Sequence, residues 1–398
     1  MSLTINAPDR LRQQVEAASQ GLCTVVYTTK GQPCFMRVIP SFTLESIDPS
    51  LGTGTHPAFV IGGVTKSEIL IGMYGGSESN GELVSQPGKV VKVQIDHDEG
   101  VTLVRANGSG WHLTTNPEWA ALGHRCWKDG FDPRGNANDG RSSDDTSEYG
   151  VSESGDPLPN GGGTRILSGS GPKSWRHDNT PWGVADLNGN VWEWAPGMRI
   201  VDGEIQVLAD NDAAADAADL SSATGPWEAI DGATGALVAP GTAGTVHYAD
   251  ANSGTADYTL YRSSGQSFEG MANSTGASPV GADALALCKA LGLFPIDSSL
   301  GGDGFHINMS GERVPFRGGN WNNGAAAGVR ALSLSRARSL SATGIGVRPA
   351  SEVSPKPPAH VAAGQRHPQK DDRSSARRRN SKQAARAGSA RERSVSPS

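Results

Sequence analysis

Short runs of β-type residues, broken by Gly, Ser and Pro, constrain the fold of this chain more than any other feature. The 398 residues include 52 Gly and 24 Pro, and 36% are hydrophobic, a composition typical of globular proteins with many loops. Runs of this length favour strands, which commonly span five or six residues. We therefore expect a β-rich α+β fold with long loops. The expected strands are Cys23–Thr28, Phe35–Ile39, Ala58–Ile61, Glu68–Met73 and Lys89–Ile95.

Two segments carry helix signals, so we expect two main helices. In the block 115–118 (TNPE), a capping Thr, a Pro in the first turn and a Glu three residues after the cap predict a helix start. A second helix is expected over Ala282–Leu291, ended by Gly292. Residues 128–180 are rich in Gly, Asn, Asp and Ser and indicate long surface loops. The Ala- and Gly-rich segment 209–244 indicates an insertion that adds little core.

The net charge of −6 conceals an uneven distribution along the chain. From residue 351 to the end, 11 Lys/Arg and 4 Asp/Glu give +7, so the preceding residues carry −13. An acidic body argues against a nucleic-acid-binding core, which needs clustered cations. Residues 351–398 contain no aromatic residue and only three Val as larger aliphatics, which predicts a disordered basic tail. The Arg run at 377–379 leaves open a weak contact with nucleic acid.

Cysteine usage and targeting signals exclude several protein classes. The four cysteines (Cys23, Cys34, Cys126 and Cys288) have neither CxxC spacing nor His at metal-ligand spacing, so we expect no disulfide framework and no zinc site. The first 21 residues lack the apolar segment of a Sec signal peptide, and no stretch of 18 apolar residues occurs. We therefore expect no membrane span. A role outside a cell would need another route, such as assembly into a particle.

The block 186–194 (DLNGNVWEW) joins a turn to a short alternating strand. Asn-Gly marks the turn, and Val-Trp-Glu-Trp alternates like a half-buried strand. Two interpretations of Glu193 stay open: a buried structural residue satisfied by a partner, or an acid or metal ligand. The structural interpretation is favoured, because no second carboxylate or His accompanies Glu193 at a useful spacing. Trp192 and Trp194 are expected to be buried.

The block from Phe316 to Ala350 mixes a scaffold with permissive positions. Alternation around Leu332 and Leu334 predicts a strand with one apolar face and one outward face bearing serines. Arginines among small residues fit guanidinium groups that bind several carbonyls. The expected structural scaffold is Trp192, Glu193, Trp194, Arg317, Gly318, Gly319, Trp321, Arg338 and Arg348. The expected ligand-binding positions are Asn320, Asn322, Asn323, Ala326, Ser333, Ser335, Arg336, Leu340, Ala342, Thr343 and Gly344.

Two residues of this block carry separate expectations. Leu340 lies between two serines, where the neighbours predict an exposed polar site. An exposed Leu beside Arg336 and small polar residues indicates a contact surface. Arg330 shares the face of Leu332 and Leu334. Because a buried unpaired guanidinium is very costly, we expect Arg330 to be paired or to lie at the edge.

Taken together, these blocks resemble a known family. GNVWEW, RGGNW and a terminal GVRPA, preceded by GWHLTTNPEW at 110–119, are similar in kind and order to the formylglycine-generating-enzyme (sulfatase-modifying-factor) type of C-type lectin fold. The resemblance covers roughly residues 25–350. It implies an N-terminal segment 1–24, a lectin-like domain 25–350 and the tail 351–398.

Residues 317–349 resemble the variable region of diversity-generating-retroelement variable proteins, which include phage receptor-binding tail proteins. In that family a reverse transcriptase rewrites template adenines, so Asn codons become many residue types while scaffold codons persist. The resemblance implies a non-enzymatic display protein without a cofactor. Its hypervariable surface would bind a protein or glycan receptor on a target cell. It would reside on a virion (a phage tail) or on a cell-surface or extracellular particle.

Other functions of the same fold differ in their chemical requirements. Enzymatic members of the family depend on a cysteine pair near the C-terminal part of the fold, and no cysteine follows Cys288, which excludes that oxidation chemistry. A catalytically inactive relative remains an alternative, as does a calcium-dependent carbohydrate lectin. The Asp/Asn-rich loops 129–145 and 186–190 offer some of the six to eight oxygens that calcium needs, so structural calcium stays open. A homo-oligomer also stays open.

Overall fold

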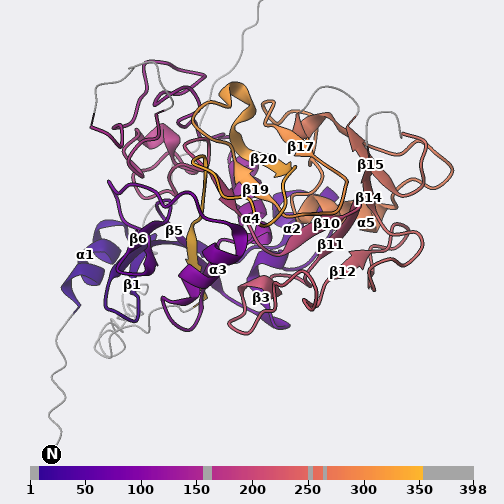
Figure 1. Ribbon diagram of the computed structural model, residues 1–398, viewed down its shortest axis with the longest axis horizontal. Coiled ribbons are helices and arrows are strands. Elements are labelled where there is room, and N and C mark those ends of the chain that lie inside the picture. Colours follow the sequence, from indigo (N-terminus) through magenta and orange to yellow (C-terminus); the bar gives the residue numbers. More distant parts are fainter. Residues whose placement is uncertain (1–8, 156–163, 250–253, 263–266, 353–398) are drawn as a thin grey trace, which may run out of the picture. The chain divides into compact units, whose positions relative to one another are not determined.

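The computed structural model describes residues 9–155, 164–249, 254–262 and 267–352. The chain separates into two units, residues 1–355 and 356–398, and every described residue belongs to the first. This unit is a mixed α and β protein, β-rich with five α-helices among its described residues (Figure 1). None of those helices has the length and apolar character that a bilayer crossing requires. The predicted tail lies outside the described residues, except for Ser351 and Glu352.

The helix signals at Thr115 and Gly292 are confirmed. The Thr115 hydroxyl accepts a hydrogen bond from the Glu118 backbone N–H, and the Glu118 carboxylate accepts one from the Thr115 backbone N–H. α5 ends just before Gly292, whose φ of +63° favours glycine. The helices are α1 (Arg10–Ala18), α2 (Leu44–Ile47), α3 (His97–Arg105), α4 (Asn116–Lys128) and α5 (Ala282–Ala290).

The expectation of two main helices is wrong, because α1 and α3 are as long as α5. The start of α3 has its own capping box between Asp96 and Glu99. That signal was present in the sequence, but it followed a segment expected to be a strand. α1 contains no fully buried residue, and its Val15 is partly buried against the cluster that contains Cys23 and Tyr74.

Three sheets hold most of the strands. Sheet one has the order β1-β2-β5-β22-β8: Cys23–Tyr27, Pro33–Pro40, Glu68–Gly72, Pro349–Ser351 and Trp111–Leu113. Sheet two has the order β17-β20-β19-β9-β21: Phe305–Ile307, Gly328–Leu334, Phe316–Gly318, Trp192–Trp194 and Ile345–Gly346. Figure 1 shows β17, β19 and β20 of sheet two side by side. Ser351 was predicted to begin the tail. Instead it is the last residue of β22, which lies between β5 and β8 in sheet one, and it is buried.

The third sheet has eight strands, and two hairpins complete the β-structure of the described residues. In sheet three, β13-β12-β11-β14-β15-β16 form a continuous path, while β10 pairs with β11 and β18. These strands are β13 (Leu237–Val238), β12 (Glu228–Ile230), β11 (Glu204–Val207), β14 (His247–Ala249), β15 (Thr259–Arg262), β16 (Met271–Asn273), β10 (Met198–Val201) and β18 (Glu312–Arg313). The hairpins are β3 (Val60–Ile61) with β4 (Val64–Thr65), and β6 (Ser77–Ser79) with β7 (Glu82–Val84).

Three of the five strands expected in the first hundred residues are confirmed as β1, β2 and β5. The strand expected at 58–61 is wrong in its first half, where Pro57–Phe59 form a 3-10 turn. The strand expected at 89–95 is wrong, since only Val93 makes an isolated bridge, to Gly346. Its backbone bonds to two different segments, since Lys92 N–H donates to the Gly76 carbonyl and Gln94 N–H donates to the Ala342 carbonyl. No single partner strand therefore imposes an extended ladder.

Segment 209–244 contributes to the core, contrary to the expectation that it adds little. Trp227, Leu220 and Ile230 are all buried, and β12 lies inside sheet three. The guanidinium carbon of Arg199 stands 4.5 Å from the centroid of the Trp227 ring. The average composition of the segment concealed this role, because a few large side chains stand among many small residues.

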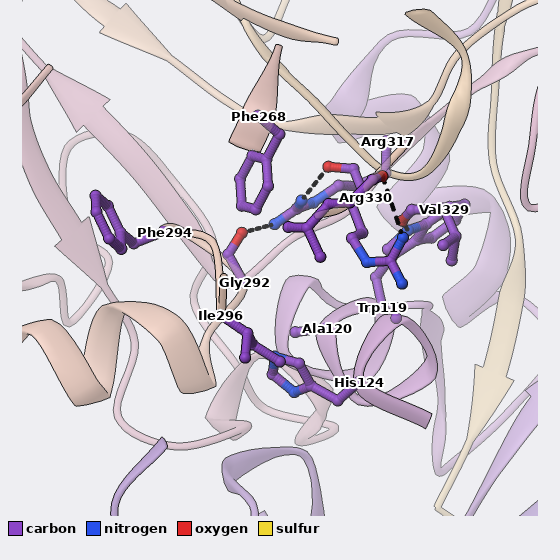
Figure 2. Close-up of a pocket in the computed structure, with 12 residues that line it drawn as sticks. Trp119, Ala120, His124, Phe268, Gly292, Phe294, Ile296, Arg317, Val329 and Arg330 are labelled. Carbon is purple, nitrogen blue, oxygen red and sulfur yellow. Dashed lines mark hydrogen bonds between the residues drawn. The ribbon is translucent and has the colours of Figure 1, made fainter. Parts of the chain in front are cut away.

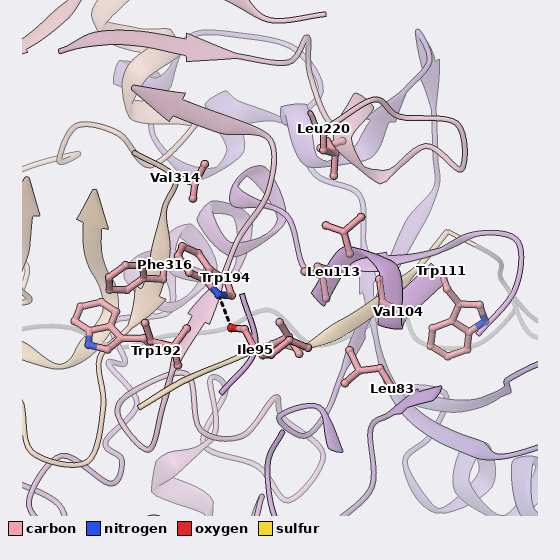
Figure 3. Close-up of a cluster of buried hydrophobic side chains, with 14 of the residues drawn as sticks. Leu83, Ile95, Val104, Trp111, Leu113, Trp192, Trp194, Leu220, Val314 and Phe316 are labelled. Atoms are coloured by element: carbon pink, nitrogen blue, oxygen red, sulfur yellow. Dashed lines mark hydrogen bonds between the residues drawn. The ribbon is translucent and has the colours of Figure 1, made fainter. Parts of the chain in front are cut away.

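An aromatic cluster occupies one side of sheet two (Figure 3). The Phe316 ring lies between those of Trp192 and Trp194, with centroids 5.1 and 5.2 Å away and near-perpendicular planes. The Trp194 indole donates a 3.1 Å hydrogen bond to the Ile95 carbonyl. Both tryptophans are buried, as expected.

The guanidinium of Arg348 joins sheet two to sheet one. It contacts both carboxylate oxygens of Glu193 in β9, at 2.7 and 2.8 Å. It also donates to the Gly72 carbonyl in β5 and to the Ala185 carbonyl, each at 2.9 Å. Burial raises the pKa of Glu193, opposed by the charge of Arg348, and this two-point contact with an obligate cation holds the carboxylate ionised. The structural interpretation of Glu193 and Arg348 is confirmed.

Replacing Glu193 by Gln should lower the free energy of unfolding by about 3–5 kcal/mol. Gln keeps the shape of the side chain but leaves the buried guanidinium of Arg348 without a counter-charge. Urea-induced unfolding followed by tryptophan fluorescence measures the change.

Glu78→Gln is the matched control, because Glu78 forms its 2.6 Å ion pair with Lys92 at the surface, where its side chain is 43% exposed. This change should cost at most about 1 kcal/mol. Equal losses in the two variants would contradict a special role for the buried pair.

Candidate functional site

Side chains on one face of sheet two form the floor of an open groove. They are His306 (β17), Ser333 (β20), Phe316 (β19), Trp192 (β9) and Ile345 (β21). Ser333 is paired with both His306 and Phe316, and Trp192 is paired with Ile345. Because paired residues face the same side of a sheet, five strands contribute one residue each to the floor.

Two loops form the rim of the groove, which encloses about 510 Å³. One loop carries Asn320, Trp321 and Asn323, and the other runs over residues 335–344. The second loop is fixed through its backbone, since the His97 N–H donates to the Arg338 carbonyl at 3.1 Å. The Arg338 side chain anchors it further through two bonds to Glu312 and one to Asp98. Arg338 is therefore structural, as expected.

Nine of the eleven expected ligand-binding positions line this groove: Asn320, Asn323, Ser333, Ser335, Arg336, Leu340, Ala342, Thr343 and Gly344. Asn322 and Ala326 do not line it. Asn322 is exposed, and Ala326 ends the 3-10 turn Gly324–Ala326. Positions scattered over 25 residues of sequence thus converge on one surface.

Several of these positions are less exposed than the sequence predicted. Ser333 is only 2% exposed, and its hydroxyl lies 2.9 Å from that of Ser335. Leu340 and Ala342 are half-buried against the aromatic cluster. Gly344 is buried, and a Cβ there would stand 2.8 Å from the amide nitrogen of Asn320. Arg336 is exposed, as expected.

Trp321 was expected to belong to the structural scaffold, but its ring is not fully buried. The ring is half-buried and lines the rim of the groove. The guanidinium carbon of Arg165 lies 5.6 Å from its centroid, and its indole N–H has no hydrogen-bond partner among the described residues. The residues after Trp321 form a 3-10 turn, so no strand carries the ring into the core.

The other scaffold arginine ties helices to sheet two. Arg317 donates to the Asn116 side chain in α4, and also to the backbone carbonyl of Gly292 after α5. Burial lowers its pKa to about 10. Arg330, expected to be paired or at the edge, is 8% exposed and paired with Asp132 at 2.7 Å. Gly318 and Gly319, the remaining scaffold residues, are buried with positive φ.

Sequence reasoning did not identify His306 and Phe316 as groove residues, and it placed Trp192 only in the core. No local pattern marks them, because their place on the floor follows from the pairing of β17 with β20 and of β9 with β19 and β21. Burial, together with the charge of Arg262, lowers the pKa of His306. The floor therefore presents a neutral imidazole at neutral pH.

A second, smaller cavity lies between α4 and sheet two (Figure 2). It measures about 30 Å³ and is lined by Trp119, His124, Phe268, Arg317 and Arg330, among others. Such a volume holds a water molecule or two. Its polar groups already bond to protein, since Arg317 donates to Gly292 (Figure 2) and His124 contacts the Lys289 carbonyl at 3.1 Å. We interpret it as a packing gap.

The groove offers no metal or thiol chemistry among the described residues. No group of three or more His, Cys, Asp or Glu there is arranged to hold a metal ion. All four cysteines are free and buried, and burial raises the pKa of Cys34 and Cys288 to about 12. In the loop 186–190, proposed to offer calcium ligands, one oxygen each of Asp186 and Asn188 is buried without a hydrogen-bond partner. Structural calcium in that loop stays a prediction.

Neither a scan of protein-family models nor a search of curated proteins found a match for this chain. The geometry and chemistry of the groove therefore carry the functional inference.

Two neighbouring groove residues should differ in their effect on stability. Arg336→Ala should change the free energy of unfolding by less than about 0.5 kcal/mol, because Arg336 is exposed. Leu340→Ala should cost about 1–2 kcal/mol, since the side chain is half-buried against the aromatic cluster. Urea unfolding of both variants tests this, and a larger loss for Arg336→Ala would show that the exposed and packed positions are interchanged.

Stability should fall in acid because of the buried pair His56 and His124. Because His56 Nδ1 accepts from the Ala58 N–H, His56 Nε2–H donates to His124 Nδ1 at 3.0 Å and His124 Nε2–H donates to the Lys289 carbonyl. Burial lowers the pKa of His124 to about 3 and also lowers that of His56. The unfolded chain binds protons first, so their contribution is complete above about pH 6.5 and is lost as pH falls toward 3.

Protonation of His124 in the unfolded chain should therefore remove about 2 kcal/mol of wild-type stability as the pH falls from 7 to 5, and His56 acts in the same direction. His124→Gln keeps a side-chain N–H donor but cannot be protonated in this range, so its stability should fall less steeply with pH. Urea unfolding at several pH values compares the slopes. Parallel slopes for the two proteins would contradict the assignment.

Proposed function

We propose that this chain is a receptor-binding display protein of the diversity-generating-retroelement type. Its fold would be the formylglycine-generating-enzyme form of the C-type lectin fold, used without catalysis. The observation that carries the proposal is the convergence of nine permissive positions on one open groove. A protein or glycan receptor on a target cell would bind there, with the protein mounted on a phage tail or on a cell-surface or extracellular particle.

The separation between groove and framework supports this proposal. Arg317, Arg338 and Arg348 stabilise the sheet and the rim of the groove. Their hydrogen bonds go to Asn116, Glu312 and Glu193, none of which is a permissive position. The rim loop is held through its own backbone atoms, at the Arg338 and Ala342 carbonyls. Side chains on such a loop can be exchanged while the backbone keeps its anchors. A surface that must tolerate replacement needs this arrangement.

The proposal predicts where natural variants of this gene differ. Amino-acid differences between sibling copies should fall at groove positions such as Asn320, Arg336 and Thr343, and should spare Arg317 and Arg348. They should arise at adenines of a near-copy of codons 317–349 that lies beside a reverse-transcriptase gene. Sequencing the locus in independent isolates measures this.

The matched comparison is the floor of the groove. Phe316 and Ile345 line the same groove but belong to the framework strands, so they should stay constant. Differences spread evenly over the chain, or a locus without a template copy, would overturn the proposed function.

A further inference from the structure

The rim amides are oriented by their own loop. The side-chain oxygen of Asn323 accepts from the Asn320 backbone N–H at 2.8 Å, and the side-chain oxygen of Asn320 accepts from the Asn322 backbone N–H at 3.3 Å. Each amide oxygen thus accepts a backbone N–H, which fixes the orientation of the amide and leaves its NH2 group on the other side. Neither amide nitrogen donates to a described residue, so the rim offers N–H donors to a ligand.

Among the described residues that line the groove, the only full charge is the positive charge of Arg336. Arg336 is exposed, and its guanidinium forms no ion pair or hydrogen bond with a described residue. No Asp or Glu is among the lining residues. Two carboxylates near the rim are already neutralised: Glu153 binds Arg165 with both oxygens, and Glu312 binds Arg338 with both oxygens. An anion entering the groove therefore meets donors and a free cation.

The rim also carries a flat apolar surface. The half-buried Trp321 ring lines the groove next to Gly344, where a Cβ would stand 3.4 Å from the ring. Gly344 packs near one edge of the ring and adds no side chain there, while the guanidinium carbon of Arg165 lies over the ring, 5.6 Å from its centroid. Tryptophan offers a large apolar face, which suits the C–H face of a sugar ring.

From these three features we propose that the groove of this chain binds a carboxylate-bearing saccharide, an inference that rests on the proposed function. Arg336 would bind the carboxylate, the Asn320 and Asn323 amides would donate to ring or hydroxyl oxygens, and the sugar face would pack on Trp321. Because Arg336 and the two asparagines are permissive positions, sibling proteins with other residues there would take other ligands.

Calorimetric titration of the full chain with matched saccharide pairs tests this inference. The probes are trigalacturonate, sialyllactose and a hyaluronan tetrasaccharide, each beside its methyl ester, which keeps the shape and removes the charge. At least one acid should bind about tenfold or more tightly than its ester, and its affinity should fall as salt concentration rises.

Three variants assign the binding to the groove. Arg336→Gln should weaken the acid by about 10- to 100-fold and leave the ester unchanged. Asn323→Asp keeps the oxygen that accepts from Asn320 but replaces the donor with an anion, so it should weaken the acid as well. Lys173→Gln is the control, because it removes an exposed cation that does not line the groove. Thermal melting verifies that all three variants are folded.

The outcomes separate this inference from the proposed function. Equal binding of acid and ester, an unaffected Arg336→Gln, or no binding of any of the three acids overturns the acidic-saccharide inference. Binding of only a neutral glycan or a protein at the groove also overturns it, while leaving the display function intact. Failure of the template-linked variation at the locus would overturn the display function itself, whatever the saccharides do.

Discussion

The buried pair of Glu193 and Arg348 is the constraint on which the arrangement of sheets one and two depends. Residues 345–351 leave sheet two as β21 and enter sheet one as β22 within a few residues. Arg348 lies at that crossing and bonds to β9 on one side and to β5 on the other. A fully buried guanidinium is tolerable only where its donors are satisfied. The Arg348 side chain therefore fixes the position of β9 in sheet two relative to β5 in sheet one.

The groove follows from that arrangement. Sheet two is packed on both faces, with Leu332 and Leu334 in one buried cluster and Trp192 and Phe316 in another. Trp192 and Phe316 of the second cluster also line the groove floor, although both side chains are largely buried. Arg338 then holds the rim loop against β18 and α3. Rigid support beneath and around an open surface lets side chains on that surface determine binding while contributing little to folding.

Features with a local cause could be predicted from the sequence. The capping box at Thr115 and the helix stop at Gly292 depend only on the few residues next to them. Both helices form where expected. Most permissive positions share the groove because they belong to one short stretch of chain. The strand expected at 89–95 failed because its backbone partners lie in separate segments. Trp227 was overlooked because the average composition of its segment concealed one large buried ring.

By itself, the sequence determined the α+β class, the arginine framework and the stretch of chain that carries the candidate site. Only the tertiary structure decided which residues form the floor, because His306 and Trp192 reach it through pairings between distant segments. It also decided that Ser333 is buried while Trp321 is half-exposed. The period-two pattern of a strand gives the face on which a side chain lies. Whether that face is covered depends on non-local packing, which no short window of sequence contains.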